Sequence, residues 1–124
     1  MNRLSSEDFG TLQQRLAFMR KHVLDEIETA EAEIELALAA KYREVGSRSD
    51  DIEALRFEEI RRSEIEIDRG MLHKIEEAEH RMMEGGYGIC ADCGESIMHE
   101  RLLALPVATR CAACEEKKET RPIR

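Results

Sequence analysis

The sequence predicts a mainly α-helical protein, in which a long antiparallel helical hairpin of coiled-coil type precedes a small module held by four cysteines and a short C-terminal helix or tail. Three observations support this fold class. Charged residues make up 37% of the 124 residues and aromatic residues only 4%, a composition typical of long helices. Apolar residues recur at helical spacing through residues 1–84, and all four cysteines follow them.

The first helix is predicted over residues 6–43. Its apolar residues alternate at spacings of three and four with charged residues between them, which is the pattern of an amphipathic helix. They are Leu12, Leu16, Met19, Val23, Ile27 or Ala30, Ile34 and Ala37. The acidic run from Asp25 to Glu35 is interpreted as a solvated helix face, and contact with a basic partner surface is the alternative.

A turn and a second helix follow, the helix predicted over about residues 50–84. Gly46 lies in a cluster of turn-forming residues, and Asp50 followed by Glu53 is a capping box. The predicted seam of this helix consists of Ile60, Ile67, Met71, Ala78 and Met82, with flanking contacts from Leu55, Phe57, Ile65, Leu72 and Ile75. Gly85 and Gly86 should end the helix.

Two long helices joined by a short turn are expected to pack antiparallel, so residues 1–84 form a hairpin whose tip lies near residues 44–51. The alternative is a parallel homodimeric coiled coil, which the same heptads support if the Gly46 region does not reverse the chain.

The four cysteines form two C-x-x-C pairs, Cys90 with Cys93 and Cys111 with Cys114, separated by seventeen residues. Each pair directs two thiolates at one ion, and two pairs complete the tetrahedron that Zn²⁺ prefers. Four sulfur ligands leave no open position, so we expect one structural zinc and no metal chemistry. The predicted finger spans residues 85–116, with residues 117–124 as a tail and a core of Ile97, Leu102, Leu103, Leu105 and Val107.

Details within the finger agree with metal binding. Gly88 and Gly94 flank the first pair, where the backbone must curl toward the thiolates. His99 lies inside the finger, but four thiolates already fill the metal shell. A disulfide framework and a redox-active C-x-x-C are the weaker alternatives, because the first belongs to secreted proteins and the second to a βαβ context that this sequence lacks.

The charge distribution narrows the function classes. The net charge is −8, and the whole of the excess falls in residues 1–84. Such a surface repels a phosphate backbone, so direct sequence-specific DNA binding is not expected. No apolar run could cross a bilayer and the N-terminus resembles no signal peptide, which indicates a cytoplasmic protein without membrane association. No set of residues suggests an enzyme.

The finger resembles that of the DksA/TraR family of transcription regulators. The shared residues are Tyr87 through Cys90, Cys93-Gly94, Arg101-Leu102, Ala104, Pro106, Ala108 and Cys111 through Cys114. The preceding helices are similar in length and order to those of the DksA-like members. The resemblance implies a protein that binds RNA polymerase directly, inserts the hairpin tip into its secondary channel and alters initiation, with a link to the stringent response.

The resemblance also implies roles for individual residues. DksA-like members carry two aspartates three residues apart at the tip; Asp50 matches the second, Ser47 stands at the first, and Asp51 adds a neighbouring carboxylate. Asp50 also suits simple helix capping.

The alarmone ppGpp is bound in the family by basic residues on the hairpin and finger. Lys74 and Arg101 match two of these positions, whereas Leu105 and Glu115 replace cations. We therefore expect a weak or absent ppGpp response.

Two other functions remain open from the sequence. A zinc ribbon could bind nucleic acid while the helices dimerise, although Arg101 and Arg110 are the only arginines or lysines of the finger. A coiled-coil adaptor with the finger as a cap is the other alternative, because a helical seam does not identify its partner.

Overall fold

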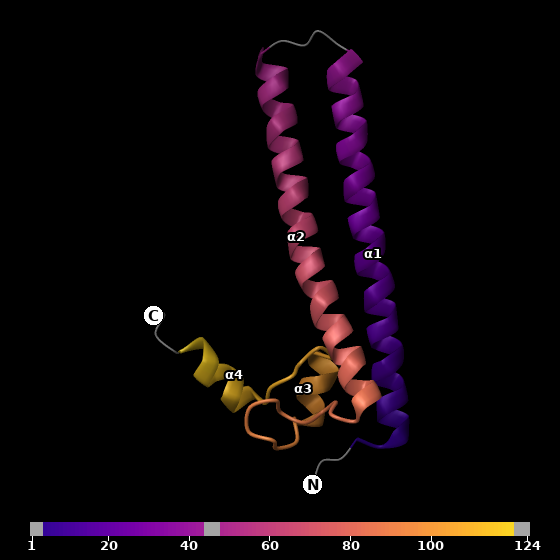
Figure 1. Cartoon of the computed structure of the whole chain (residues 1–124), viewed down its shortest axis with the longest axis vertical. Coiled ribbons are helices and arrows are strands. Elements are labelled where there is room, and N and C mark those ends of the chain that lie inside the picture. The colour runs from indigo at the N-terminus through magenta and orange to yellow at the C-terminus, as the bar shows by residue number, and fades with distance from the viewer. Residues whose placement is uncertain (1–3, 44–47, 121–124) are drawn as a thin grey trace. The chain divides into compact units, whose positions relative to one another are not determined.

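The structure, a computed structural model, describes the backbone of residues 4–43 and 48–120, and the side chains of those residues apart from 41–51. Its helices are α1 (Ser6–Arg43), α2 (Arg48–Glu84), α3 (His99–Ala104) and α4 (Ala112–Glu119) (Figure 1). Across the described ranges, β pairing is confined to an isolated antiparallel bridge between Ile89 and Ser96. The mainly α fold, with long helices ahead of the cysteines, is confirmed.

Packing divides the chain into two compact units. The hairpin unit is Arg20–His73, and the finger unit comprises Met1–Met19 and Lys74–Arg124. The two long helices contribute residues to both units. These units are defined by packing and do not test the predicted boundaries after residues 84 and 116, which stay predictions.

Helix α1 has the predicted bounds and a side-chain cap. Ser5 Oγ accepts a hydrogen bond from the N–H of Asp8 at 3.0 Å, and the Ser5 carbonyl accepts one from Phe9 at 2.9 Å. Glu7 and Asp8 lie in the first turn, where negative charge complements the helix dipole. The buried residues follow the predicted spacing: Leu12, Leu16, Val23, Ile27, Ala30 and Ile34.

Helix α2 begins at Arg48, two residues before the predicted start, and ends at Glu84 as expected. Asp50 and Asp51 therefore lie in its first turn rather than before it. The C-terminal end depends on Gly85, whose φ of 81° is left-handed, and on the N–H of Gly86, which donates to the Arg81 carbonyl at 2.9 Å. A residue with a β-carbon rarely adopts that φ, which is why a glycine ends the helix.

The predicted seam of α2 is wrong in the hairpin unit. Ile60 and Ile67 are 58% and 72% exposed, whereas Ile65, predicted only to flank the seam, is 5% exposed. In the finger unit, Ile75, Ala78 and Met82 are buried. The buried face of α2 thus repeats every seven residues through Ile75 and Met82, and this repeat places Arg61 and Asp68 toward α1 in the hairpin unit.

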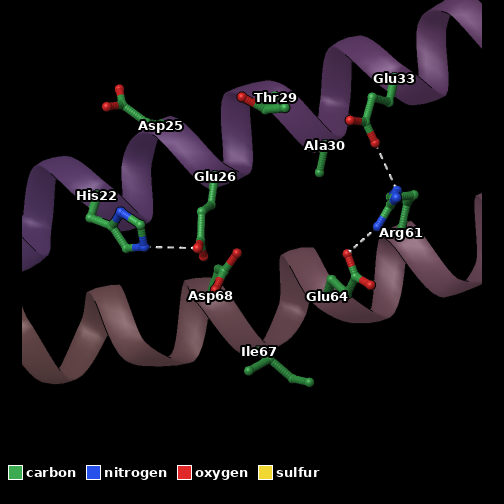
Figure 2. Close-up of a pocket in the computed structure, with 10 residues that line it drawn as sticks. All are labelled: His22, Asp25, Glu26, Thr29, Ala30, Glu33, Arg61, Glu64, Ile67 and Asp68. Carbon is green, nitrogen blue, oxygen red and sulfur yellow. Dashed lines mark hydrogen bonds and ion pairs between the residues drawn. The ribbon is translucent and has the colours of Figure 1, made fainter.

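Contacts with α1 explain why this face is tolerated (Figure 2). Arg61 Nε lies 2.8 Å from Glu33 Oε2 of α1, and Arg61 Nη1 lies 2.7 Å from Glu64 Oε2. Asp68 points toward Glu26 of α1, while Ile67 points away from α1. Because Glu33 faces Arg61 and the earlier residue Glu26 faces the later Asp68, the two helices run antiparallel in this unit, as predicted.

The finger unit has a core built from the first part of α1, the end of α2 and residues 87–108. Ile97 and Leu102 are 1% and 0% exposed, and Leu12, Leu16, Tyr87, Val107 and Ala108 are also buried. Leu103 and Leu105, predicted as core, are 38% and 40% exposed, which corrects that prediction. The six-residue helix α3 turns Leu102 inward, so its neighbour Leu103 faces another side.

Tyr87 joins the finger to α1. Its hydroxyl donates a 2.8 Å hydrogen bond to the Pro106 carbonyl, and its ring meets that of Phe9 edge to face, with centroids 6.3 Å apart. Burial raises the pKa of Tyr87 to about 12, so the phenol remains a donor at neutral pH. Arg15 of α1 also donates to the carbonyl of Leu103.

Among the residues that the structure describes, no helix is both long and apolar enough to span a membrane.

Candidate metal centre

The first cysteine pair lies on a tight loop between α2 and α3. The N–H of Cys90 donates to the Glu95 carbonyl at 2.8 Å, and the N–H of Gly94 donates back to the Cys90 carbonyl at 3.0 Å. These bonds and the bridge between Ile89 and Ser96 close a small turn that presents both thiols on one side.

The glycines of this loop have the roles expected from the sequence. Gly88 and Gly94 have φ values of 84° and 76°, in the left-handed region that favours glycine. A methyl group at Gly88 would also lie 3.4 Å from Cδ1 of Leu4, whereas Gly94 has open space around it. Gly88 is therefore constrained by conformation and by a close contact, and Gly94 by conformation alone.

The second cysteine pair occupies the start of α4. Cys111 is the N-cap residue, with extended backbone angles, and Cys114 lies in the first turn. The N–H of Glu115 donates to the Cys111 carbonyl at 3.0 Å, which holds that turn. A helix start places residues three positions apart on one face, so both thiols point the same way.

The four thiols converge on one point. All four sulfur atoms lie within 4.8 Å of one another, and Cys93 Sγ is 3.8 Å from Cys111 Sγ. Sulfurs at the corners of a tetrahedron around a zinc ion, with bonds of about 2.3 Å, lie about 3.8 Å apart. Covalent pairing requires about 2.05 Å, and the four cysteines are free thiols. The donor set and its dimensions fit one Zn²⁺.

The thiols have unequal acidities. Burial opposes ionisation of Cys90, but hydrogen bonds from the backbone N–H groups of Cys93, Cys111 and Asp92 outweigh it and lower its pKa to about 6. Hydrogen bonds with the thiols of Cys111 and Cys90, followed by burial, raise the pKa of Cys114 to about 12. Four thiolates cannot coexist so closely without a cation, so metal binding must release protons.

Asp92 and Arg110 were not predicted as site residues. Arg110 Nε lies 2.8 Å from Asp92 Oδ2, which joins the first pair to the residue before the second. Arg101 Nε donates to the Arg110 carbonyl at 3.0 Å. An aspartate inside the first C-x-x-C and an arginine next to the second were the available signals, but sequence alone does not reveal that they meet.

The other predicted residues are placed as follows. His99 Nδ1 lies 3.7 Å from Asp8 Oδ2, and His99 is not part of the sulfur cluster. Lys74 is an exposed residue of α2 in the finger unit, which also contains Arg101. The side chains of Asp50 and Asp51, and the whole of Ser47, lie outside the described part of the structure.

Comparison with known proteins places the finger in a described group. Residues 85–119 match the family described as "Prokaryotic dksA/traR C4-type zinc finger". A protein of Aquifex aeolicus is 42% identical over 57 residues, which cover 46% of this chain and 38% of that protein. The "RNA polymerase-binding transcription factor DksA" of Caulobacter vibrioides is 40% identical over 53 residues, covering 43% and 37% of the two chains. The matches thus span less than half of these relatives.

Similarity in structure extends over nearly the whole chain. The structure of the transcription factor DksA2 from Pseudomonas aeruginosa matches with a TM-score of 0.81 and 26% identity. The match covers 94% of this chain and 87% of that one. The long helices as well as the finger therefore have counterparts in that protein.

Proposed function

Because this chain belongs to the DksA/TraR family, we propose that it is a transcription regulator that acts by binding RNA polymerase directly. The observation that carries the proposal is the likeness to DksA2, since it includes the long helices as well as the metal centre. Regulation would then come from binding rather than catalysis. The site of action would be the cytoplasm, where the polymerase works.

The proposed mechanism places the turn between α1 and α2 in the secondary channel of the polymerase. A pair of packed helices is thin enough to enter a narrow pore, and carboxylates at the turn between them can act on basic groups or a metal ion nearby. Asp50 and Asp51, in the first turn of α2, are the proposed carboxylates.

A nucleic-acid role receives less support from the finger. Both of its arginines already have partners within the finger, Arg110 with Asp92 and Arg101 with the Arg110 carbonyl. A DNA- or RNA-binding ribbon normally directs such cations outward to phosphates. We therefore propose no direct sequence-specific DNA binding.

A weak or absent response to ppGpp is part of the proposal. Leu105, 40% exposed, and Glu115 offer no cation, and Arg101 already donates through Nε to a backbone carbonyl. We expect no tight ppGpp binding by the complex with polymerase. A tight, salt-sensitive isotherm that Lys74→Ala abolishes would contradict this part.

The test is a binding and initiation assay with purified RNA polymerase. Wild type, Asp50→Asn and Asp51→Asn are compared with Asp25→Asn, a control that removes one exposed carboxylate from α1. We expect all four to bind, and only the α2 variants to lose their effect on initiation.

The outcomes separate the two parts of the proposal. Failure of wild type to bind polymerase would refute the proposed function itself. If the Asp50 and Asp51 variants bind polymerase and affect initiation as wild type does, only the role of these two carboxylates is refuted.

A further inference from the structure

The two loops that carry the cysteine pairs need contacts besides the metal to hold their positions relative to each other. Seventeen residues separate Cys93 from Cys111, so the loops are distant in sequence and each carries two mutually repelling thiolates. Two contacts described below join the segment inside the first loop to the segment just before the second, and a third contact holds the second segment from α3. They are one backbone bond, one ion pair and one hydrogen bond that braces the pair.

The backbone bond sets the distance between the loops. The N–H of Ala91 donates to the carbonyl of Thr109 at 2.7 Å. The next residue of each segment, Asp92 in one and Arg110 in the other, takes part in the 2.8 Å ion pair. Two consecutive residues of each loop thus face each other, all of them within two positions of a cysteine.

A hydrogen bond from α3 holds the backbone of Arg110. Arg101, which follows the first loop on α3, donates through Nε to the carbonyl of Arg110 at 3.0 Å. The Arg110 side chain is only 26% exposed, whereas that of Asp92 is 47% exposed. Arg110 is therefore held at its backbone and at its guanidinium, unlike a freely moving surface arginine.

We propose that Asp92 and Arg110 form a knuckle latch that keeps zinc in its site. Loss of the ion from a four-thiolate site requires the two loops to separate, so that fewer than four sulfurs hold the metal. The latch must break for this separation, and it therefore slows zinc release. Asp92 and Arg110 act as positioning residues, because neither carries a zinc ligand. This inference concerns the metal centre alone and does not depend on polymerase binding.

The experiment measures the rate of zinc release from the zinc-loaded full-length protein after addition of excess chelator. Asp92→Asn and Arg110→Gln are expected to release zinc about two- to fivefold faster, the range of a partly exposed ion pair. Arg62→Gln is the matched control, because it breaks an ion pair of 2.8 Å with Glu58 in the hairpin unit. It should release zinc at the wild-type rate.

Four further measurements separate a latch from a general loss of structure. The double variant should release zinc no faster than the quicker single variant, because both changes break the same pair. The charge-swapped pair Asp92→Arg with Arg110→Asp should recover part of the wild-type rate. Raising the salt concentration should bring wild type closer to the single variants. Cobalt substituted for zinc should show unchanged tetrahedral absorption bands in all variants.

Several results would overturn the inference. Wild-type release rates in both single variants would do so, as would effects that simply add in the double variant. A variant with altered cobalt bands would place its defect in the ligand geometry, and Asp92→Glu, which keeps the charge, would then decide. A release rate close to that of wild type supports the latch, and a rate as fast as that of Asp92→Asn refutes it. Slow release in every variant refutes it.

Discussion

Asp68 shows how a single residue in a helical interface can weaken it. Burial, the carboxylate of Glu26 and that of Glu64 raise the pKa of Asp68, while His22 acts in the opposite direction. His22 Nε2 lies 2.9 Å from Glu26 Oε1, and both residues belong to α1 (Figure 2). The folded protein therefore holds a proton on Asp68 more readily than the unfolded chain does.

Asp68→Asn should stabilise the protein at neutral pH. A group whose folded pKa is raised favours folding below its ordinary pKa, and this contribution is lost as the pH rises through the raised value. The variant avoids that loss, so at pH 7 its free energy of unfolding should exceed that of wild type by up to about 1 kcal/mol. Urea titrations at several pH values should show the advantage shrinking as the pH falls toward 4.

Asp25→Asn is the control, since the Asp25 carboxylate points away from Asp68 (Figure 2). At pH 7 it should show no gain in stability over wild type. A variant of Asp68 that is less stable than wild type at pH 7 would show that the carboxylate stabilises the interface, contrary to the repulsion described above.

At the scale of elements, α2 carries two competing apolar stripes. One contains Ile60 and Ile67, which the heptad spacing favours, and the other contains Ile65 and Ile75. Packing buries the second stripe, although this turns Arg61 and Asp68 toward α1. Glu33 supplies Arg61 with a partner across the interface, which reduces the cost of a charge at that position.

Alanine substitutions two residues apart test this assignment. Ile65→Ala should lower the free energy of unfolding by about 2 to 4 kcal/mol, because it removes a buried side chain and leaves a cavity. Ile67→Ala, at a 72% exposed position of the same helix, should change it by less than about 0.5 kcal/mol. Both are measured by urea denaturation. Equal losses in the two variants would contradict the assigned buried face.

The helices also differ in how fully the sequence predicts them. The bounds of α1 and its buried stripe follow from the three- and four-residue spacing of its apolar residues. The phase of α2 could not be predicted in the same way. Two stripes satisfy the same periodicity, and only the contacts with α1 distinguish them.

At the scale of the whole molecule, the metal should matter most to the finger unit. A finger of about 30 residues is too small to fold on hydrophobic burial alone, and structural zinc commonly contributes on the order of 10 kcal/mol. The same unit includes Met1–Met19 and Lys74–Arg124, whose core contains Leu12, Ile75 and Leu102. Unfolding of the finger removes partners from that core.

Zinc removal should therefore act regionally. After chelation, amide hydrogens of Lys74–Arg124 should exchange faster by at least about tenfold, and those of α3 should lose protection first. Amides of the hairpin unit, Arg20–His73, should keep most of their protection. The readout is hydrogen exchange followed by mass spectrometry. A uniform loss of protection along the chain would show that the two units unfold together.

The sequence by itself determined the two long helices and the four cysteines of the metal site. Helical periodicity, glycines at helix ends and C-x-x-C spacing are local properties, because each depends only on residues close together in the sequence. The tertiary structure alone decided which stripe of α2 is buried, that Leu103 and Leu105 are exposed, and that Asp92 meets Arg110. These outcomes depend on which distant segments pack together, and periodicity carries no information about the partner across an interface.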